Sequence, residues 1–195
     1  MSPIEPSEII IKELISLYDK KKFDELLRLS NEILGEFPNS ILIQNIQGVV
    51  YTELKNYRLA KDLFIKVIKL SPRYTDGYYN LANICSKLHE ENNAIENYNY
   101  ASLTDDEKIK SIAYQQLGNI NESKNNLEDA LNYYKNSIIS NNMNNDSKFN
   151  YELVKKKIES NKNNKEDKKE KEKNKSEEKN NDKKENQDNK DKNKN

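Results

Sequence analysis

A set of small, aromatic and helix-ending residues recurs at a near-constant interval along most of this 195-residue chain. Gly48 is followed by Tyr51, Ala60, Phe64 and Pro72. Shifts of 34 residues backward, 34 forward and a further 36 forward give three matching sets: Leu14, Leu17, Leu26, Ser30, Pro38; Ala82, Cys85, Ala94, Tyr98, Asp106; and Gly118, Asn121, Ala130, Tyr134, Asn142. Small or apolar residues occupy most of these positions, and a two-residue insertion falls near 105–109. Such self-similarity predicts stacked copies of one structural unit.

Each unit has the pattern of a helical hairpin. Two segments carry apolar residues three and four positions apart, as amphipathic helices do. Gly48 and Ala60 fall where the two helices of the second unit would cross, and Tyr51 and Phe64 would fill the space beside that crossing. Pro72 would end the second helix, because proline lacks the N–H and disfavours helix at the residue before it. A lone hairpin cannot bury its own apolar face, so we expect an all-α solenoid of stacked hairpins.

The repeat sets the expected boundaries. We expect an N-terminal extension over 1–6 and hairpin units over about 7–40, 41–74, 75–108 and 111–144. A capping helix over 146–160 would follow, with Phe149, Leu153 and Val154 toward the stack. Residues 161–195 comprise 13 Lys, 10 Asp or Glu, 10 Asn, one Ser and one Gln, so we expect a disordered tail.

Charge and hydropathy exclude some partners. Without the tail, residues 1–160 carry 20 basic and 23 acidic side chains, with no basic stripe of the kind that duplex nucleic acid requires. No stretch approaches the ~20 apolar residues of a membrane span. The first residues lack the basic segment of a secretory signal, so we expect a cytoplasmic protein.

The sequence offers no catalytic or metal-binding constellation. Cys85 and His89 lie four residues apart on one expected helix, but they are the only Cys and the only His. A structural zinc site takes four ligands and a catalytic one usually three from the protein. The four glycines form no phosphate-binding loop. We therefore expect no enzyme, no cofactor and no metal, with Cys85 buried as a packing residue and His89 at a loop edge.

The spacing resembles the tetratricopeptide repeat (TPR), W-x2-L-G-x2-Y…A-x3-F…P. The segments "QGVVY" with "LAKDLF" and "SP", "NLANIC" with "NAIENY", and "QQLGNI" with "EDALNY" resemble three successive repeats, after a degenerate first one. The resemblance covers about residues 7–144 and implies a non-catalytic adaptor that holds a partner protein.

In TPR proteins the first helix of each unit lines a concave groove. By that resemblance the groove would contain Asn45, Val49, Tyr79, Asn80, Asn83, Gln115, Gln116 and Asn119. Amides can donate to and accept from a peptide backbone without demanding a particular side-chain sequence, so we expect an extended peptide as the ligand. The alternative is that these amides are only surface polar residues.

The resemblance also excludes one partner. TPR co-chaperones grip the acidic C-terminus of heat-shock proteins with Lys, Arg and Asn. The matching positions here are Ile11, Ile15, Ile46, Asp76 and Asn80. Only Asn80 fits, and Asp76 would repel a carboxylate, so we predict no carboxylate clamp for heat-shock proteins.

Three further interpretations stay open. The segment 114–159, followed by the polar tail, resembles the C-terminal part of Bacteroides aerotolerance-type TPR proteins, which implies a membrane-associated or periplasmic accessory. The N-terminal units also resemble the regulatory repeat arm of a glycosyl- or methyltransferase. Self-association through an exposed end of the solenoid is the third.

Overall fold

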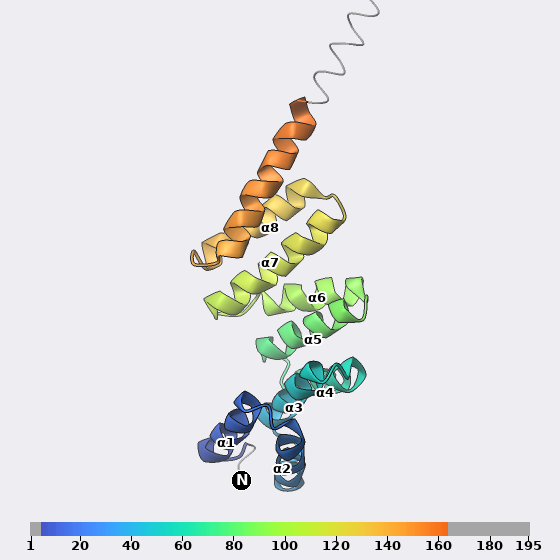
Figure 1. Cartoon of the computed structure of the whole chain (residues 1–195), viewed down its shortest axis with the longest axis vertical. Helices are drawn as coiled ribbons and strands as arrows, with labels where there is room; N and C mark the ends of the chain where they lie inside the picture. The colour runs from blue at the N-terminus through green and yellow to red at the C-terminus, as the bar shows by residue number, and fades with distance from the viewer. Residues whose placement is uncertain (1–4, 164–195) are drawn as a thin grey trace, which may run out of the picture.

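The computed structural model describes residues 5–163, and within them it is all-α, as predicted. Its helices stack along one long axis, with the N-terminal hairpin at one end (Figure 1). Their bounds are α1 Glu8–Asp19, α2 Phe23–Glu36, α3 Ile41–Glu53, α4 Tyr57–Leu70, α5 Thr75–Lys87, α6 Glu91–Ala101, α7 Glu107–Ser123 and α8 Leu127–Ser140. A further helical stretch over 145–163, named here the C-terminal helix, follows α8. The predicted tail falls almost wholly on 164–195, outside the described residues.

Consecutive helices pair into the four expected hairpins, and the first helices of the hairpins contact one another. α1 contacts α3, α3 contacts α5, and α5 contacts α7, while α4 packs against α5 and α6 against α7. The first helices therefore share one surface, and the second helices lie on the other side of the stack.

The turn inside each hairpin repeats with the same backbone geometry. The left-handed residues are Lys21, Lys55, His89 and Asn125, with φ of 56–61°, at intervals of 34, 34 and 36 residues. The next residue's N–H reaches back to the carbonyl five positions earlier, as in Asn56 to Tyr51 at 2.8 Å and Glu90 to Cys85 at 2.8 Å. This hydrogen bond is typical of a helix that ends at a left-handed residue. The backbone conformation therefore recurs at the same intervals as the packing side chains.

The close helix crossings occur where predicted. A Cβ added to Gly48 would lie 2.6 Å from the Phe64 ring, and one added to Gly118 would lie 2.5 Å from the Tyr134 ring. Ala60, Phe64, Ala130 and Tyr134 are all buried. The small residue thus admits the aromatic ring of the second helix, which confirms the packing pattern read from the sequence.

The fourth unit begins earlier than expected. α6 ends at Ala101, and α7 begins at Glu107 rather than near 111. Asp106 causes the early start, because its carboxylate accepts from the backbone N–H of Lys108 at 2.8 Å and of Ile109 at 3.0 Å, as an N-cap does. The inserted residues therefore lengthen α7.

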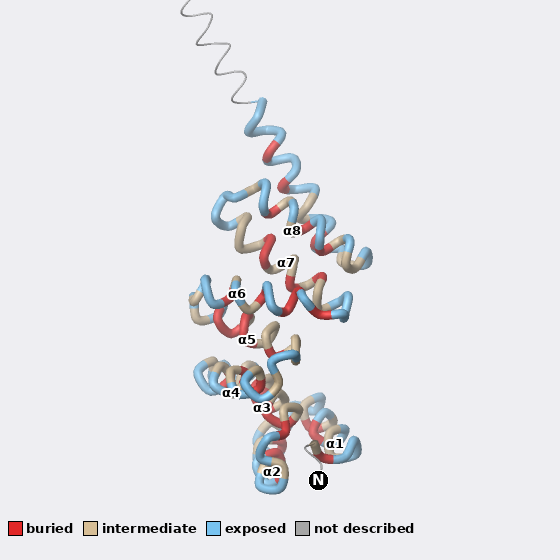
Figure 2. Tube along the Cα trace, turned by 180° about the vertical axis from the view of Figure 1, so that it is seen from behind, coloured by how far each residue is buried: buried red, intermediate tan, exposed pale blue. Residues whose placement is uncertain are grey.

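The C-terminal helix packs with a different face from the one predicted. Val154 and Ile158 are buried against α8, whereas Phe149 is 69% exposed and Leu153 39% exposed. Of the three residues expected to face the stack, only Val154 is buried. Most of the remaining surface of this helix is exposed (Figure 2).

The phase of the repeat explains this packing face. Successive shifts of 34, 36 and 34 residues lead from buried Val50 through Ile84 and Ile120 to Val154. The C-terminal helix therefore takes the place of a first helix in a fifth unit. Phe149 and Leu153 then lie on the surface shared by the first helices, away from α8.

Two predicted boundaries shift at the ends of the stack. Residues 161–163 are helical rather than part of the tail, because exposed polar residues can prolong a helix. At the other end, the Glu5 carboxylate accepts hydrogen bonds from the Ser40 hydroxyl and, at 2.8 Å, from the Ile41 N–H. Glu5 thus caps α3 from a distance, so this residue of the predicted extension contributes to the fold.

Candidate protein-binding surface

The eight predicted groove residues all lie on the surface shared by the first helices. They are half-buried and come from α3, α5 and α7: Asn45, Val49, Tyr79, Asn80, Asn83, Gln115, Gln116 and Asn119. We call this surface, together with the equivalent positions of α1 and the C-terminal helix, the first-helix strip. Phe149 and Leu153 belong to it, because they follow Gln115 and Asn119 by 34 residues.

Two of the predicted residues hold the aromatic core in place. The Tyr98 hydroxyl donates to Asn83 Oδ1 at 2.7 Å, and the Tyr134 hydroxyl donates to Asn119 Oδ1 at 2.9 Å. Burial raises the pKa of Tyr98 to about 12, so this phenol stays neutral and donates. For these two amides, a structural role is therefore established by the contacts.

Of the other amides, Asn45, Gln115 and Gln116 accept hydrogen bonds at their side-chain oxygens, whereas Asn80 donates through its NH2 group. Asn80 donates to Asn45 Oδ1 at 2.9 Å, Asn144 donates to Gln115 Oε1 at 2.9 Å, and Asn119 donates to Gln116 Oε1 at 3.3 Å. Among residues 5–163, none accepts a hydrogen bond from the NH2 groups of Asn45, Gln115 or Gln116. These groups are donors available to a ligand.

An apolar hollow of about 120 Å³ lies between α1 and α3. Its lining residues are Ile15, Tyr18, Asn45, Ile46 and Val49. Sequence reasoning identifies Asn45 and Val49, misses Tyr18, and considers Ile15 and Ile46 only as positions where a carboxylate clamp is absent. The repeat itself could have identified Ile15, because Ile15 precedes Val49 by 34 residues and so occupies the equivalent position of the first unit.

A second hollow, of about 450 Å³, lies where α7 meets the C-terminal helix. Gln115 and Gln116 line it, together with Ile112, Met143 and Asn144. The predicted residues therefore do not form one continuous pocket. Asn45 and Val49 line the apolar hollow toward the N-terminal end of the strip, and Gln115 and Gln116 line the amide-rich hollow toward its C-terminal end. The other four predicted residues line neither hollow: Tyr79, Asn80, Asn83 and Asn119.

Cys85 and His89 do not form a site. α5 ends at Lys87, so His89 lies outside the helix, in the turn with φ of 60°, which corrects the expectation of a shared helix. Cys85 is buried, and burial raises the pKa of its thiol. Across residues 5–163, no three Cys, His, Asp or Glu side chains lie close enough together to hold a metal ion. No helix in that range is long and apolar enough to cross a membrane.

Comparison with known proteins matches this geometry. The family model described as "Tetratricopeptide repeat" matches residues 43–74 and 111–138, which are α3–α4 and most of α7–α8. The chain contains tetratricopeptide repeats. The TPR solenoid is also the fold of the MamA crystal structure, which is 20% identical, with a TM-score of 0.65 over 73% of this chain and 82% of that one.

Two other solved structures share the fold. One is YrrB, described as a TPR protein with an unusual peptide-binding site, at 19% identity and a TM-score of 0.63, covering 79% of this chain and 78% of that one. The other is pilF from Pseudomonas aeruginosa, at 14% identity and a TM-score of 0.72, covering 78% and 69%. At these identities the likeness is one of fold alone.

One curated relative shares sequence with the TPR region. It is the RNA polymerase-associated protein CTR9 of Caenorhabditis elegans, 26% identical over 146 residues. The match takes in 71% of this chain but only 12% of that protein. The shared part is therefore a small fraction of the relative.

Proposed function

We propose that this TPR stack is a protein-interaction module that binds an extended segment of a partner along the first-helix strip. The observation that carries the proposal is the apolar hollow of Ile15, Tyr18, Asn45, Ile46 and Val49, in which the Asn45 NH2 group donates to no other residue of the range 5–163. Mediating contacts between proteins is what TPR stacks generally do.

The hollow suits one aliphatic side chain. Its volume of about 120 Å³ exceeds several-fold the roughly 30 Å³ that one water occupies in the liquid, so it can hold a side chain. Three aliphatic side chains and the Tyr18 ring form most of its wall. An apolar group placed there would leave water for an apolar environment, which favours binding.

The amides suit a peptide backbone. The NH2 groups of Asn45, Gln115 and Gln116 can each donate to a backbone carbonyl, and such bonds do not depend on the ligand's side chains. Because the amides are already oriented by their contacts with neighbouring side chains, little side-chain entropy would be lost on binding.

An acidic C-terminal tail is a poor candidate for the ligand. Ile15 and Ile46 line the hollow where a clamp would need cations, and Asp76 adds negative charge. Burial, together with the nearby Asp106 carboxylate, raises the pKa of Asp76, so a further carboxylate placed beside these two residues would be disfavoured. No observation favours the aerotolerance or transferase-arm interpretations, which stay predictions.

Selection from a random peptide library displayed on phage tests the proposal. The full chain would be used as bait, with Ile15→Asp as the groove variant and Ile139→Asp as the matched control, since Ile139 lies exposed on α8. We expect enriched peptides that share an aliphatic residue and that bind the control as well as the unmodified chain, but bind Ile15→Asp at least about tenfold more weakly. Circular dichroism would confirm that both variants are folded. Equal binding to Ile15→Asp would contradict the proposal.

A further inference from the structure

A third cleft, larger than the two hollows of the first-helix strip, lies on the opposite side of the stack, between the second helices α4 and α6 with α5 beneath them. Its volume is about 480 Å³. Ile65 and Ile68 of α4 and Leu81 and Cys85 of α5 give it an apolar floor. This outer cleft shares no lining residue with the first-helix strip.

Two stacked tyrosines form one wall of the outer cleft. The rings of Tyr78 and Tyr100 lie 5.0 Å apart between centroids, at 26° to one another. Tyr100 is 47% exposed, so part of its aromatic surface is open to a ligand. In the second unit the equivalent positions are Gln44 and Lys66, so the pair does not belong to the packing that all units share.

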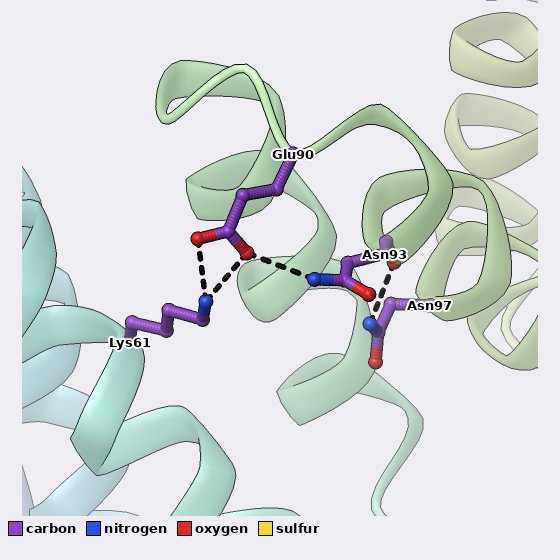
Figure 3. A network of polar contacts seen from close by, with 4 residues as sticks. All are labelled: Lys61, Glu90, Asn93 and Asn97. Carbon is purple, nitrogen blue, oxygen red and sulfur yellow. Dashed lines mark hydrogen bonds and ion pairs between the residues drawn. The ribbon is translucent and has the colours of Figure 1, made fainter.

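At the rim of the cleft, the positive charge of Lys61 is neutralised by an ion pair. Lys61 pairs with Glu90, and the Asn93 NH2 donates to the same carboxylate at 2.9 Å (Figure 3). The Asn97 NH2 donates to the Asn93 backbone carbonyl at 2.7 Å. The groups left on the rim are therefore mainly acceptors, namely the side-chain carbonyl oxygens of Asn93 and Asn97.

Glu96 adds a net negative charge to this rim. It lines the cleft, and it forms no ion pair with any residue in the range 5–163. Since Lys61 and Glu90 neutralise each other, the cleft carries one uncompensated carboxylate beside two aromatic rings.

We propose that the outer cleft binds an arginine side chain of a partner protein, flanked by aliphatic residues. A guanidinium stacks on tyrosine faces, and its fork of N–H donors matches a carboxylate and amide carbonyls. The aliphatic neighbours would cover the floor of Ile65, Ile68 and Leu81. This site is separate from the first-helix strip, so it does not rest on the function proposed above.

The test is a titration of the full chain with the peptide acetyl-Ala-Leu-Arg-Leu-Ala-amide, monitored by NMR of the tyrosine rings and of the isoleucine, leucine and valine methyls. The matched probe replaces arginine with citrulline, which has the same shape without the charge. We expect shifts at Tyr78, Tyr100 and Leu81, and about five- to tenfold weaker binding of the citrulline peptide.

Two variants separate the proposal from nonspecific attraction. Glu96→Gln removes the charge from the cleft, and Asp62→Asn removes the equivalent charge one unit earlier, outside the cleft. We expect the first to weaken arginine binding about as much as citrulline does and the second to leave it unchanged. Equal binding of the two peptides, equal effects of the two variants, or shifts confined to Ile15, Ile46 and Val49 would overturn the proposal.

Discussion

The Tyr98 hydroxyl donates a hydrogen bond to Asn83 Oδ1 at 2.7 Å, and the fourth unit repeats this bond between Tyr134 and Asn119 at 2.9 Å. In the second unit the equivalent residues are Phe64 and Val49, which are both apolar. The two positions therefore change together: a phenol on the second helix accompanies an amide on the first, and a phenyl ring accompanies an aliphatic side chain.

A double-mutant cycle tests this relationship. We expect Tyr98→Phe to lower the free energy of unfolding by about 0.5–1.5 kcal/mol, and Asn83→Val, which leaves a buried hydroxyl without its acceptor, by about 1–3 kcal/mol. The double variant recreates the pair of the second unit, so its loss should be smaller than the sum of the two by at least about 0.5 kcal/mol. Urea denaturation measures all four proteins, and additive losses would contradict the coupling.

The same pair predicts a response to alkaline pH. Burial raises the pKa of Tyr98 to about 12 from the ordinary value of 10.0. A group whose pKa is raised in the folded state contributes stability that is complete below its unfolded pKa, so this contribution should be lost between about pH 10 and pH 12. The free energy of unfolding should fall between about pH 9 and about pH 11, and it should fall less in the double variant Asn83→Val and Tyr98→Phe than in the unmodified chain. Chemical denaturation at the two pH values measures this, and an equal fall in both proteins would contradict the assignment.

The glycines offer a test of the helix crossings. A Cβ at Gly118 would lie 2.5 Å from the Tyr134 ring, which cannot easily move because its hydroxyl also bonds Asn119 and Glu122. We expect Gly118→Ala to destabilise the fold by about 1–3 kcal/mol through overpacking. The matched control is Gly35→Ala in α2, where the new Cβ would have no neighbour within 4 Å, and which should gain up to about 1 kcal/mol of helix propensity. Thermal denaturation measures both variants, and melting temperatures that change in the same direction for the two would contradict this account.

The C-terminal helix gives a comparison of a buried residue with an exposed one. Val154→Ala should lower the free energy of unfolding by about 1–3 kcal/mol, because Val154 is fully buried against α8. Phe149→Ala should change it by less than about 0.5 kcal/mol, because Phe149 is largely exposed. Chemical denaturation distinguishes the two variants. A larger loss of unfolding free energy for Phe149→Ala than for Val154→Ala would contradict this packing and support the face predicted from the sequence.

The repeat in the sequence predicts the fold well because packing residues recur at fixed intervals. Gly48, Ala60 and Phe64 identify one hairpin, and the same spacing locates the others. It predicts the ends of the stack less well. The apolar character of Phe149 suggests burial, whereas its phase with Gln115 places it on the exposed strip.

The candidate site is harder to predict for a different reason. Position on a first helix shows that an amide faces the strip, but not what it bonds. Asn83 and Asn119 are used by tyrosine hydroxyls, and those contacts depend on side chains 15 residues away on another helix. The apolar hollow likewise depends on two helices, which bring Tyr18 beside Ile46.

The most direct test of the central claim is methyl NMR of the full chain during titration with a peptide selected on it. We predict that the largest shifts fall on Ile15, Ile46 and Val49, which line the hollow between α1 and α3, and that Ile15→Asp removes them. If the peptide binds but the methyls of these three residues do not shift, the claim that the first-helix strip is the binding surface is contradicted.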